Sequence, residues 1–223
     1  MGLTIVLFVP EGVVMASDGL AFNQNDIKDD EYAHKKQQSL ILYRNKYLIG
    51  IPNHVFIHGI SISYYIQKAL NNLLSNIDIN QFIDELVSEL IKLGVPKEQI
   101  VFYIAGHNRN FEYDLFLYDR DKLVNINTGN NGERVYNFHS MGRTVWIDKL
   151  LYGIVEQPEQ STEDQIINID FSKYSIGDAV DFAYKMIAYS HDLDYFTQVK
   201  QIIGEQIDIA YIDCLGNMIK IKK

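Results

Sequence analysis

The residues of this sequence that could carry out chemistry are hydroxyl-bearing side chains and lysines. A hydroxyl group attacks a carbonyl carbon once a nearby base takes its proton, and an amine can serve as that base. Thr4 lies close to the start of the sequence, and Lys35 and Lys36 lie further along. Thr4 is one candidate for the attacking hydroxyl. Three serines are alternative nucleophiles for the same lysines: Ser17, Ser39 and Ser140.

Two groups of residues resemble metal ligands, but neither has a complete ligand pattern. His54 and His58 have a spacing that places two imidazoles on one face of a helix. This pair lacks the glutamate of the His-Glu-x-x-His motif, and it lies where a strand-like run meets a helical one. The second group is acidic and lacks the spacing and the glycine of an EF-hand loop: Asp26, Asp29, Asp30 and Glu31. We therefore expect no metal ion and no cofactor.

Composition limits the class of protein. The chain has 223 residues, of which 47% are hydrophobic, enough to fill the core of one domain spanning 1–223. The formal net charge of −9 argues against binding to nucleic acid or to an anionic membrane surface. The sequence shows no secretory signal and no apolar run of the ~18–20 residues that a membrane-spanning helix needs. A single cysteine, Cys214, excludes a disulfide framework within the chain and is compatible with a reducing compartment. We expect a cytoplasmic protein.

The hydrophobic pattern predicts blocks of strands that alternate with pairs of helices. Strands are expected at 3–9, 12–18, twice within 39–52, and at 99–107, 112–119, 122–128, 205–213 and 218–223. Helices are expected at 60–77, 78–94, 142–157 and 175–192. Asp78 or Asn80 is the expected N-cap of the second helix, and residues 23–38 are polar and expected to form a loop. The order lacks the strand-helix-strand rhythm of a parallel sheet. It predicts an α+β fold, a four-layer αββα sandwich of two antiparallel sheets flanked by helix pairs.

Four stretches, in order along the chain, resemble proteasome β-type subunits and their simpler bacterial peptidase relatives, which are N-terminal nucleophile hydrolases. They read TIVLFVPEGVVMASDG, LYRNKYLIGI, FYIAGHN with YDLFLYD, and GEQIDIAYID with GN. The first is the most specific, because its hairpin leads to an Ala-Ser-Asp whose aspartate the family places beneath the active site. In that family the mature chain begins with threonine. Its hydroxyl attacks the peptide carbonyl, its own α-amino group accepts the proton, and a nearby lysine tunes that amine.

The resemblance places the family's catalytic positions on residues that cannot perform this chemistry. When the family's aspartate is aligned with Asp18, the nucleophile position falls on Gly2. When the strand is aligned from Thr4, that position falls on Leu3. The family's lysine falls at or near Gln38, a neutral residue. The serine of a Gly-Ser-Gly motif, and the aspartate and serine of a late Asp-x-x-Ser-Gly motif, fall on Met141, Lys200 and Ile203. Thr4 is an imperfect substitute, because a two-residue displacement along a strand moves a side chain by ~6.6–7 Å.

These substitutions favour a protein that has lost the family's reaction and works by assembly or binding. The resemblance implies a homo-oligomer, with a ring as one form, and a protein or peptide partner is compatible with it. The first alternative is a working threonine- or serine-type peptidase or amidohydrolase. It would use Thr4 as an N-terminal nucleophile after cleavage behind Leu3, or one of the three serines with a displaced Lys35 or Lys36. The second is a module that binds a small ligand in the vacated cleft under Asp18.

Overall fold

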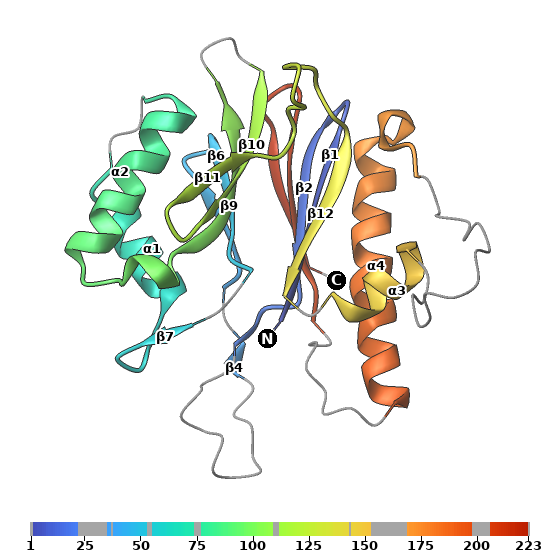
Figure 1. Cartoon of the computed structure of the whole chain (residues 1–223), viewed down its shortest axis with the longest axis horizontal. Coiled ribbons are helices and arrows are strands. Elements are labelled where there is room, and N and C mark those ends of the chain that lie inside the picture. The colour runs from blue at the N-terminus through green and yellow to red at the C-terminus, as the bar shows by residue number, and fades with distance from the viewer. Residues whose placement is uncertain are drawn as a thin grey trace.

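Ten of the described strands form two five-stranded sheets. The computed structural model describes residues 2–21, 35–36, 38–52, 55–73, 77–108, 112–142, 144–152, 169–197 and 206–222. The strands of the first sheet are β1 (Leu3–Val9), β2 (Gly12–Ser17), β12 (Asn137–Gly142), β13 (Asp208–Asp213) and β14 (Met218–Lys222). Those of the second are β5 (Leu40–Tyr43), β6 (Tyr47–Gly50), β9 (Val101–His107), β10 (Tyr113–Asp119) and β11 (Lys122–Asn125). Their orders are β12-β1-β2-β13-β14 and β11-β10-β9-β6-β5, and all neighbours within them are antiparallel (Figure 1).

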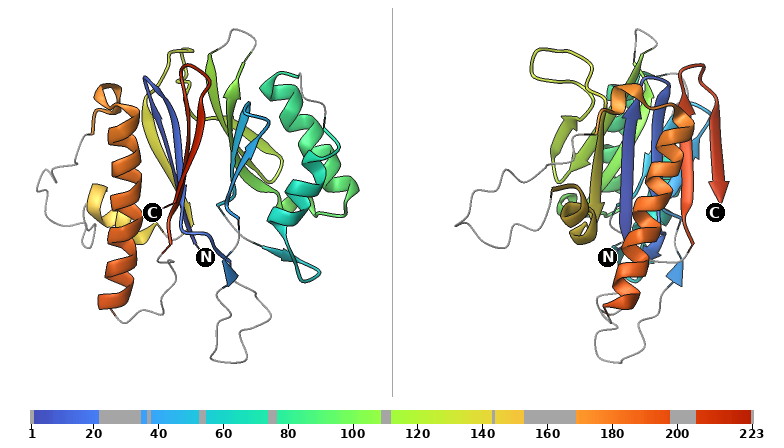
Figure 2. Two further views of the ribbon diagram at one scale, coloured as in Figure 1. Left: turned by 180° about the vertical axis from the view of Figure 1, so that it is seen from behind. Right: turned by 90° about the vertical axis from the view of Figure 1, so that its right-hand side faces the viewer.

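Helices cover the outer face of each sheet. They are α1 (Ile62–Leu70), α2 (Ile79–Lys92), α3 (Val145–Tyr152) and α4 (Ile176–Phe196). Two short 3-10 turns, η2 (Lys97–Gln99) and η3 (Phe171–Lys173), lie between larger elements. The helices α1 and α2 lie on one side of the molecule, and α3 and α4 lie on the other (Figures 1 and 2). The predicted α+β fold with two antiparallel sheets and helices is therefore confirmed.

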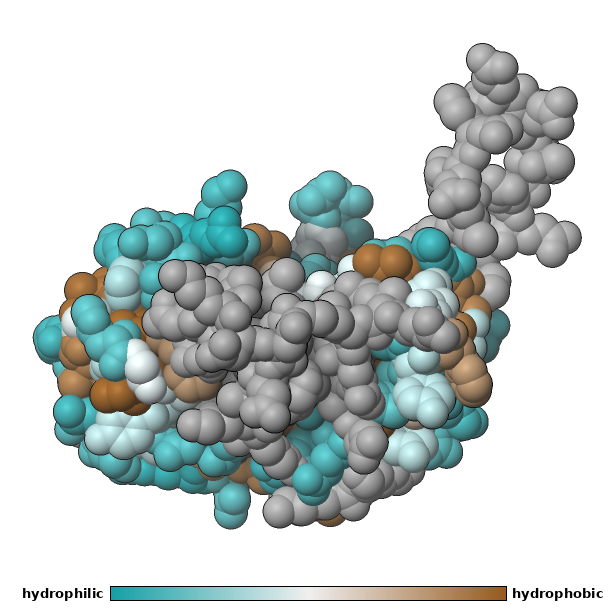
Figure 3. Space-filling view, turned by 90° about the horizontal axis from the view of Figure 1, so that it is seen from below, coloured by the Kyte–Doolittle hydropathy of each residue, from teal (hydrophilic) through white to brown (hydrophobic). Residues whose placement is uncertain are grey.

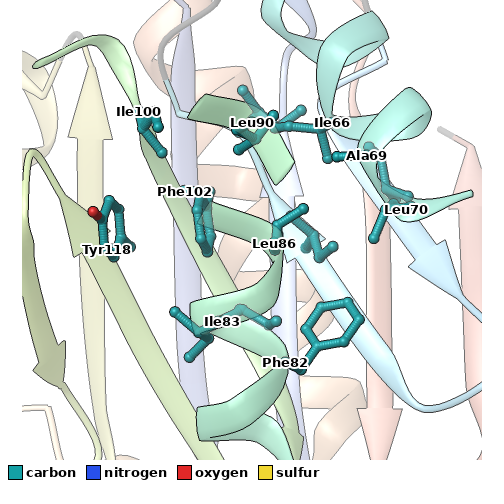
Figure 4. Close-up of a cluster of buried hydrophobic side chains, with 14 of the residues drawn as sticks. Ile66, Ala69, Leu70, Phe82, Ile83, Leu86, Leu90, Ile100, Phe102 and Tyr118 are labelled. Atoms are coloured by element: carbon teal, nitrogen blue, oxygen red, sulfur yellow. The ribbon is translucent and has the colours of Figure 1, made fainter. Parts of the chain in front are cut away.

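Three apolar clusters fill the spaces between these layers. The first lies between the α1–α2 pair and the second sheet and includes Phe82, Leu86 and Phe102 (Figure 4). The second lies between the first sheet and α3 and α4, and the third lies between the two sheets. Alternate side chains of a strand point to opposite faces. Accordingly, Ile5 enters the cluster against α4, and Val6 enters the cluster between the sheets.

Local sequence signals explain where the helices begin. The side chain of Asp78 accepts hydrogen bonds from the backbone N–H groups of the first turn of α2, which confirms it, rather than Asn80, as the N-cap. Ser175 and Asp178 form a capping box at the start of α4. α1 ends at Leu70, whereas the helix was predicted to continue to residue 77. α4 continues to Phe196, beyond the predicted end at residue 192.

Several short strands differ from the prediction. Asn137–Gly142 was not predicted to be a strand, yet it forms β12 at the edge of the first sheet. Within the predicted loop, β4 (Lys35–Lys36) pairs with β3 (Leu20–Ala21). Residues at the start of the first predicted helix form β8 (Ile60–Ser61), which pairs with β7 (Phe56–Ile57). Residues 153–168 and 198–205 lie outside the described part of the chain.

Candidate functional site

The candidate site lies at the end of the first hairpin, where β1 begins and β2 ends. Asp18 follows β2 directly and is 3% exposed. The backbone N–H of Leu3 donates a hydrogen bond to Asp18 Oδ1 at 3.1 Å, and the N–H of Asp18 donates to the carbonyl of Leu3 at 3.3 Å. The aspartate therefore fixes the backbone of the residue that follows Gly2, at the position where the resemblance expects catalysis.

Gly2 is buried at this end of the sheet and contacts Gly142. Leu3 and Gly142 are register partners in β1 and β12, and Gly142 has a φ of +105°. A β-carbon built on Gly142 would lie 2.0 Å from the carbonyl oxygen of Gly2, so a side chain cannot be placed there without movement. The side chain of Leu3 belongs to the apolar cluster against α4. Neither Gly2 nor Leu3 offers a hydroxyl.

Thr4 is fully buried and points into the layer between the sheets, because it lies on the same face of β1 as Val6. Its register partners are Ser17 on β2 and Met141 on β12. The hydroxyl of Thr4 donates a hydrogen bond to Ser17 Oγ at 3.0 Å. The thioether of Met141 therefore lies on the other side of Thr4, at the position where the resemblance expects a serine.

The other predicted serines are not brought to this place. Ser140 is the register partner of Ile5, so it points to the opposite face of the sheet from Thr4. Ser39 is fully buried immediately before β5 in the second sheet, and its carbonyl accepts a hydrogen bond from the N–H of Ile51 at 2.8 Å. Of the three serines, Ser17 alone neighbours Thr4 in the sheet register.

The two lysines of the alternative mechanism lie on β4, which pairs with the residues that follow Asp18. Lys36 pairs with Leu20, and Lys35 pairs with Ala21, just beyond Asp18. A role for Lys35 or Lys36 beside an alternative nucleophile stays a prediction. Lys200 and Ile203 lie outside the described residues.

Gln38 does not supply a cation, and its amide is used to bind other groups. Its Nε2 donates to the carbonyl oxygen of Leu40 at 3.2 Å, and its Oε1 accepts from Gln67 Nε2 of α1 at 2.8 Å. A lysine from the other end of the chain reaches the same carbonyl. Lys220 Nζ lies 3.4 Å from the oxygen of Leu40 and 3.6 Å from Asp208 Oδ2. No local sequence pattern points to Lys220.

A tyrosine and a histidine join the two sheets nearby. Tyr103 of β9 and His139 of β12 are hydrogen-bonded through the tyrosine hydroxyl and Nδ1, with 2.5 Å between these atoms. His139 is the register partner of Val6, so it points between the sheets, as Thr4 and Met141 do. Burial lowers the pKa of His139 and raises the pKa of Tyr103. Both groups are therefore held neutral near pH 7. No sequence motif points to this pair, because the two residues are far apart in the sequence.

The metal-site hypotheses gain no support. His58 lies in the turn between β7 and β8 with a φ of +50°, so the helical spacing suggested for it and His54 is wrong. His54 and the acidic group at 26–31 lie outside the described residues. Within the described ranges no three His, Cys, Asp or Glu side chains are grouped so that they could hold a metal ion. The same part of the chain contains no helix that is long and apolar enough to cross a membrane.

Comparison with known proteins then places the fold. No protein-family model and no curated protein matches the sequence. A Gly-1 mutant of Anbu from Hyphomicrobium sp. strain MC1 matches with a TM-score of 0.63 and 11% identity over 100% of this chain and 87% of the mutant chain. Anbu from Yersinia bercovieri, an ancestral β-subunit, matches with a TM-score of 0.58 and 9% identity over 99% of this chain and 87% of its own. The chain has the Anbu fold.

The match to Anbu, an ancestral β-subunit, confirms the predicted resemblance at the level of the fold. At about one identical residue in ten, the likeness to Anbu carries no residue roles. The candidate site therefore rests on its own geometry: a buried Asp18 that holds Leu3, a buried Thr4–Ser17 pair, and Lys220 beside Asp208.

Proposed function

We propose that this protein is a non-catalytic member of the proteasome-like, Anbu-fold proteins and works as a structural or binding subunit of a cytoplasmic homo-oligomer. The observation that carries the proposal is the start of β1. The carboxylate of Asp18 binds the N–H of Leu3, and the two residues at this position, Gly2 and Leu3, have no group that can attack a carbonyl. Without a nucleophile there is no acyl transfer.

The surroundings of Thr4 further support the proposal. Thr4 is fully buried between Met141 and Ser17, and β1 is paired with a strand on each side of it. A threonine nucleophile needs a free α-amino group beside its hydroxyl and a path for the substrate carbonyl. Exposing Thr4 would remove the Leu3 N–H that Asp18 holds.

The layering supports the finer assignment of the fold. Helix pairs on the outer faces and two sheets between them agree with a single αββα domain. Seen from the end at which β1 begins, hydrophilic and hydrophobic residues are interspersed on the described surface (Figure 3). The assembly is inferred from the fold.

An active hydrolase is the second candidate, and the position of the lysine backbones favours it. The strand Lys35–Lys36 is paired with Leu20–Ala21, next to Asp18 along the chain. A lysine at this place could act on Thr4 or Ser17 if the N-terminal residues were removed. The candidate then requires a chain that begins at Thr4 or a hydroxyl that becomes accessible.

Peptide hydrolysis and covalent labelling separate the two candidates. Purified protein is incubated with a fluorogenic peptide set and with an electrophilic threonine-directed inhibitor, and intact mass is recorded before and after. We expect no turnover above that of the matched Thr4→Val variant, no adduct, and a chain that still contains Leu3. Turnover that Thr4→Val abolishes, or an acyl adduct on any hydroxyl, would contradict the proposal.

A further inference from the structure

Lys220 connects the two sheets at the end that contains the candidate site. It lies on β14, the last strand of the first sheet, and its register partner on β13 is Ala210, which belongs to the cluster between the sheets. Paired residues of an antiparallel ladder share a face, so Lys220 points into that layer. Its ammonium lies 3.6 Å from Asp208 Oδ2 in its own sheet and 3.4 Å from the carbonyl oxygen of Leu40 in the other.

These contacts place the ammonium beside the position where the resemblance expects a lysine. The carbonyl of Leu40 that Lys220 approaches also accepts from Gln38 Nε2. Asp208 is the register partner of Ser17, and Ser17 is the register partner of Thr4. Lys220 on β14 therefore stands at one end of a row of polar side chains that continues over β13, β2 and β1. Asp208 is 3% exposed, and the row ends in the buried hydroxyl of Thr4.

The strand that carries Lys220 is weakly held. It pairs with β13 on one side and forms the edge of its sheet. Among its residues with described side chains, Met218, Ile219, Lys220 and Ile221, none is buried, and Ile219 is 43% exposed. Its neighbour β13 has Ile209, Ala210 and Ile212 fully buried. Segments with few buried contacts open locally at a lower free energy than the core does.

We propose that Lys220 tethers β14 to both sheets and that β14 is a strap which closes this end of the layer between the sheets. The ion pair with Asp208 and the bond to the Leu40 carbonyl tie the strap to both sheets. When the strap detaches, Asp208 loses its counter-charge and the Ser17–Thr4 row becomes accessible to water. This device operates whether or not the site catalyses a reaction, so its test is separate from the test of the proposed function.

Hydrogen exchange measured by mass spectrometry on the full chain tests the strap. In Lys220→Met, we expect amide exchange in 38–42 and 206–210 to become about fivefold faster or more, because opening of β14 no longer breaks an ion pair. Lys220→Arg should retain slow exchange, since it keeps the charge and a donor. Lys122→Met is the matched control, because Lys122 is an exposed lysine on the edge strand β11 of the other sheet, and it should leave both segments unchanged.

A second variant keeps the test decisive if Lys220→Met lowers global stability. Asp208→Asn removes the partner carboxylate, and in that background Lys220→Met should accelerate exchange by a smaller factor than in the wild-type chain. Equal acceleration in both backgrounds would overturn the pairing. Acceleration of 12–14, at the far end of β2, to the same degree as 38–42 would overturn the local strap, because it would report general destabilisation.

Discussion

At the scale of single residues, Asp18 has a structural task that does not depend on catalysis. Its carboxylate accepts a hydrogen bond from the N–H of Leu3, and its own N–H donates a hydrogen bond to the carbonyl of Leu3. We expect Asp18→Ala to lower the free energy of unfolding by about 1–3 kcal/mol, because it leaves a buried N–H without that acceptor. Asp18→Asn keeps an acceptor oxygen and should cost less. Urea denaturation checks the order, and equal losses in the two variants would show that the charge, not the hydrogen bond, matters.

Gly142 is a second residue whose identity the geometry requires. In Gly142→Ala the new β-carbon would overlap the Gly2 carbonyl, and the residue would also have to keep a φ of +105°. We expect a loss of more than about 2 kcal/mol in the free energy of unfolding. Gly132→Ala is the control, since Gly132 has a φ of +80° and open space around it, and only the backbone cost of about 1–2 kcal/mol should be seen. Equal losses would mean that the contact with Gly2 is easily relieved.

The sequence predicted the near neighbours of the site better than the distant ones. Asp18 could be placed beside the start of β1, because a hairpin brings residues that are close in the sequence together. The apolar residue at position 141 was also identified in advance, and β12 brings it beside Thr4. Lys220 could not be found in this way, because its approach to Leu40 depends on the packing of one sheet on the other. No local pattern encodes that distance.

At the scale of elements, strongly periodic segments were predictable and context-dependent ones were not. The hairpin β1–β2 has hydrophobic residues throughout and a Pro-Glu-Gly turn, and it forms nearly as expected. β12 reads Asn-Phe-His-Ser-Met-Gly, a composition with little preference for strands. It becomes a strand because β1 offers an unpaired edge, which is a property of the assembled sheet. The predicted helix 60–77 likewise loses its first residues to pairing between β7 and β8.

The hydrogen bond between Tyr103 of β9 and His139 of β12 should make the free energy of unfolding depend on pH. Burial lowers the pKa of His139 below its ordinary value of 6.5, so the unfolded chain binds its proton more readily than the folded chain. The stability that the neutral histidine contributes is complete above pH 6.5 and is lost as the pH falls below it. We expect the free energy of unfolding to decrease between pH 7 and pH 5, and His139→Gln to reduce that decrease.

The matched control for this prediction is His58→Asn. His58 is an exposed turn residue at φ +50°, a conformation that asparagine tolerates, so the variant should keep the pH dependence of the parent protein.

Tyr103→Phe should lower the free energy of unfolding at pH 7 by about 1–3 kcal/mol, because His139 Nδ1 loses its buried partner. An unchanged pH profile in His139→Gln would assign the titration to other groups.

At the scale of the whole molecule, net charge determines how the proposed assembly should respond to salt. Each copy carries a formal charge of −9, so association of identical copies brings like charges together. The Debye length falls from about 30 Å at 0.01 M salt to about 8 Å at 0.15 M, which screens this repulsion. We expect light scattering to report a mass above the 25.7 kDa of one chain at 0.15 M salt, and a shift toward the single-chain mass at 0.01 M. The two salt conditions are compared at one protein concentration, and the intact mass confirms that the chain is unchanged. A mass of one chain at both salt concentrations would remove the assembly from the proposed function. An assembly that weakens as the salt concentration rises would show that the copies are held together by contacts between opposite charges rather than by apolar burial.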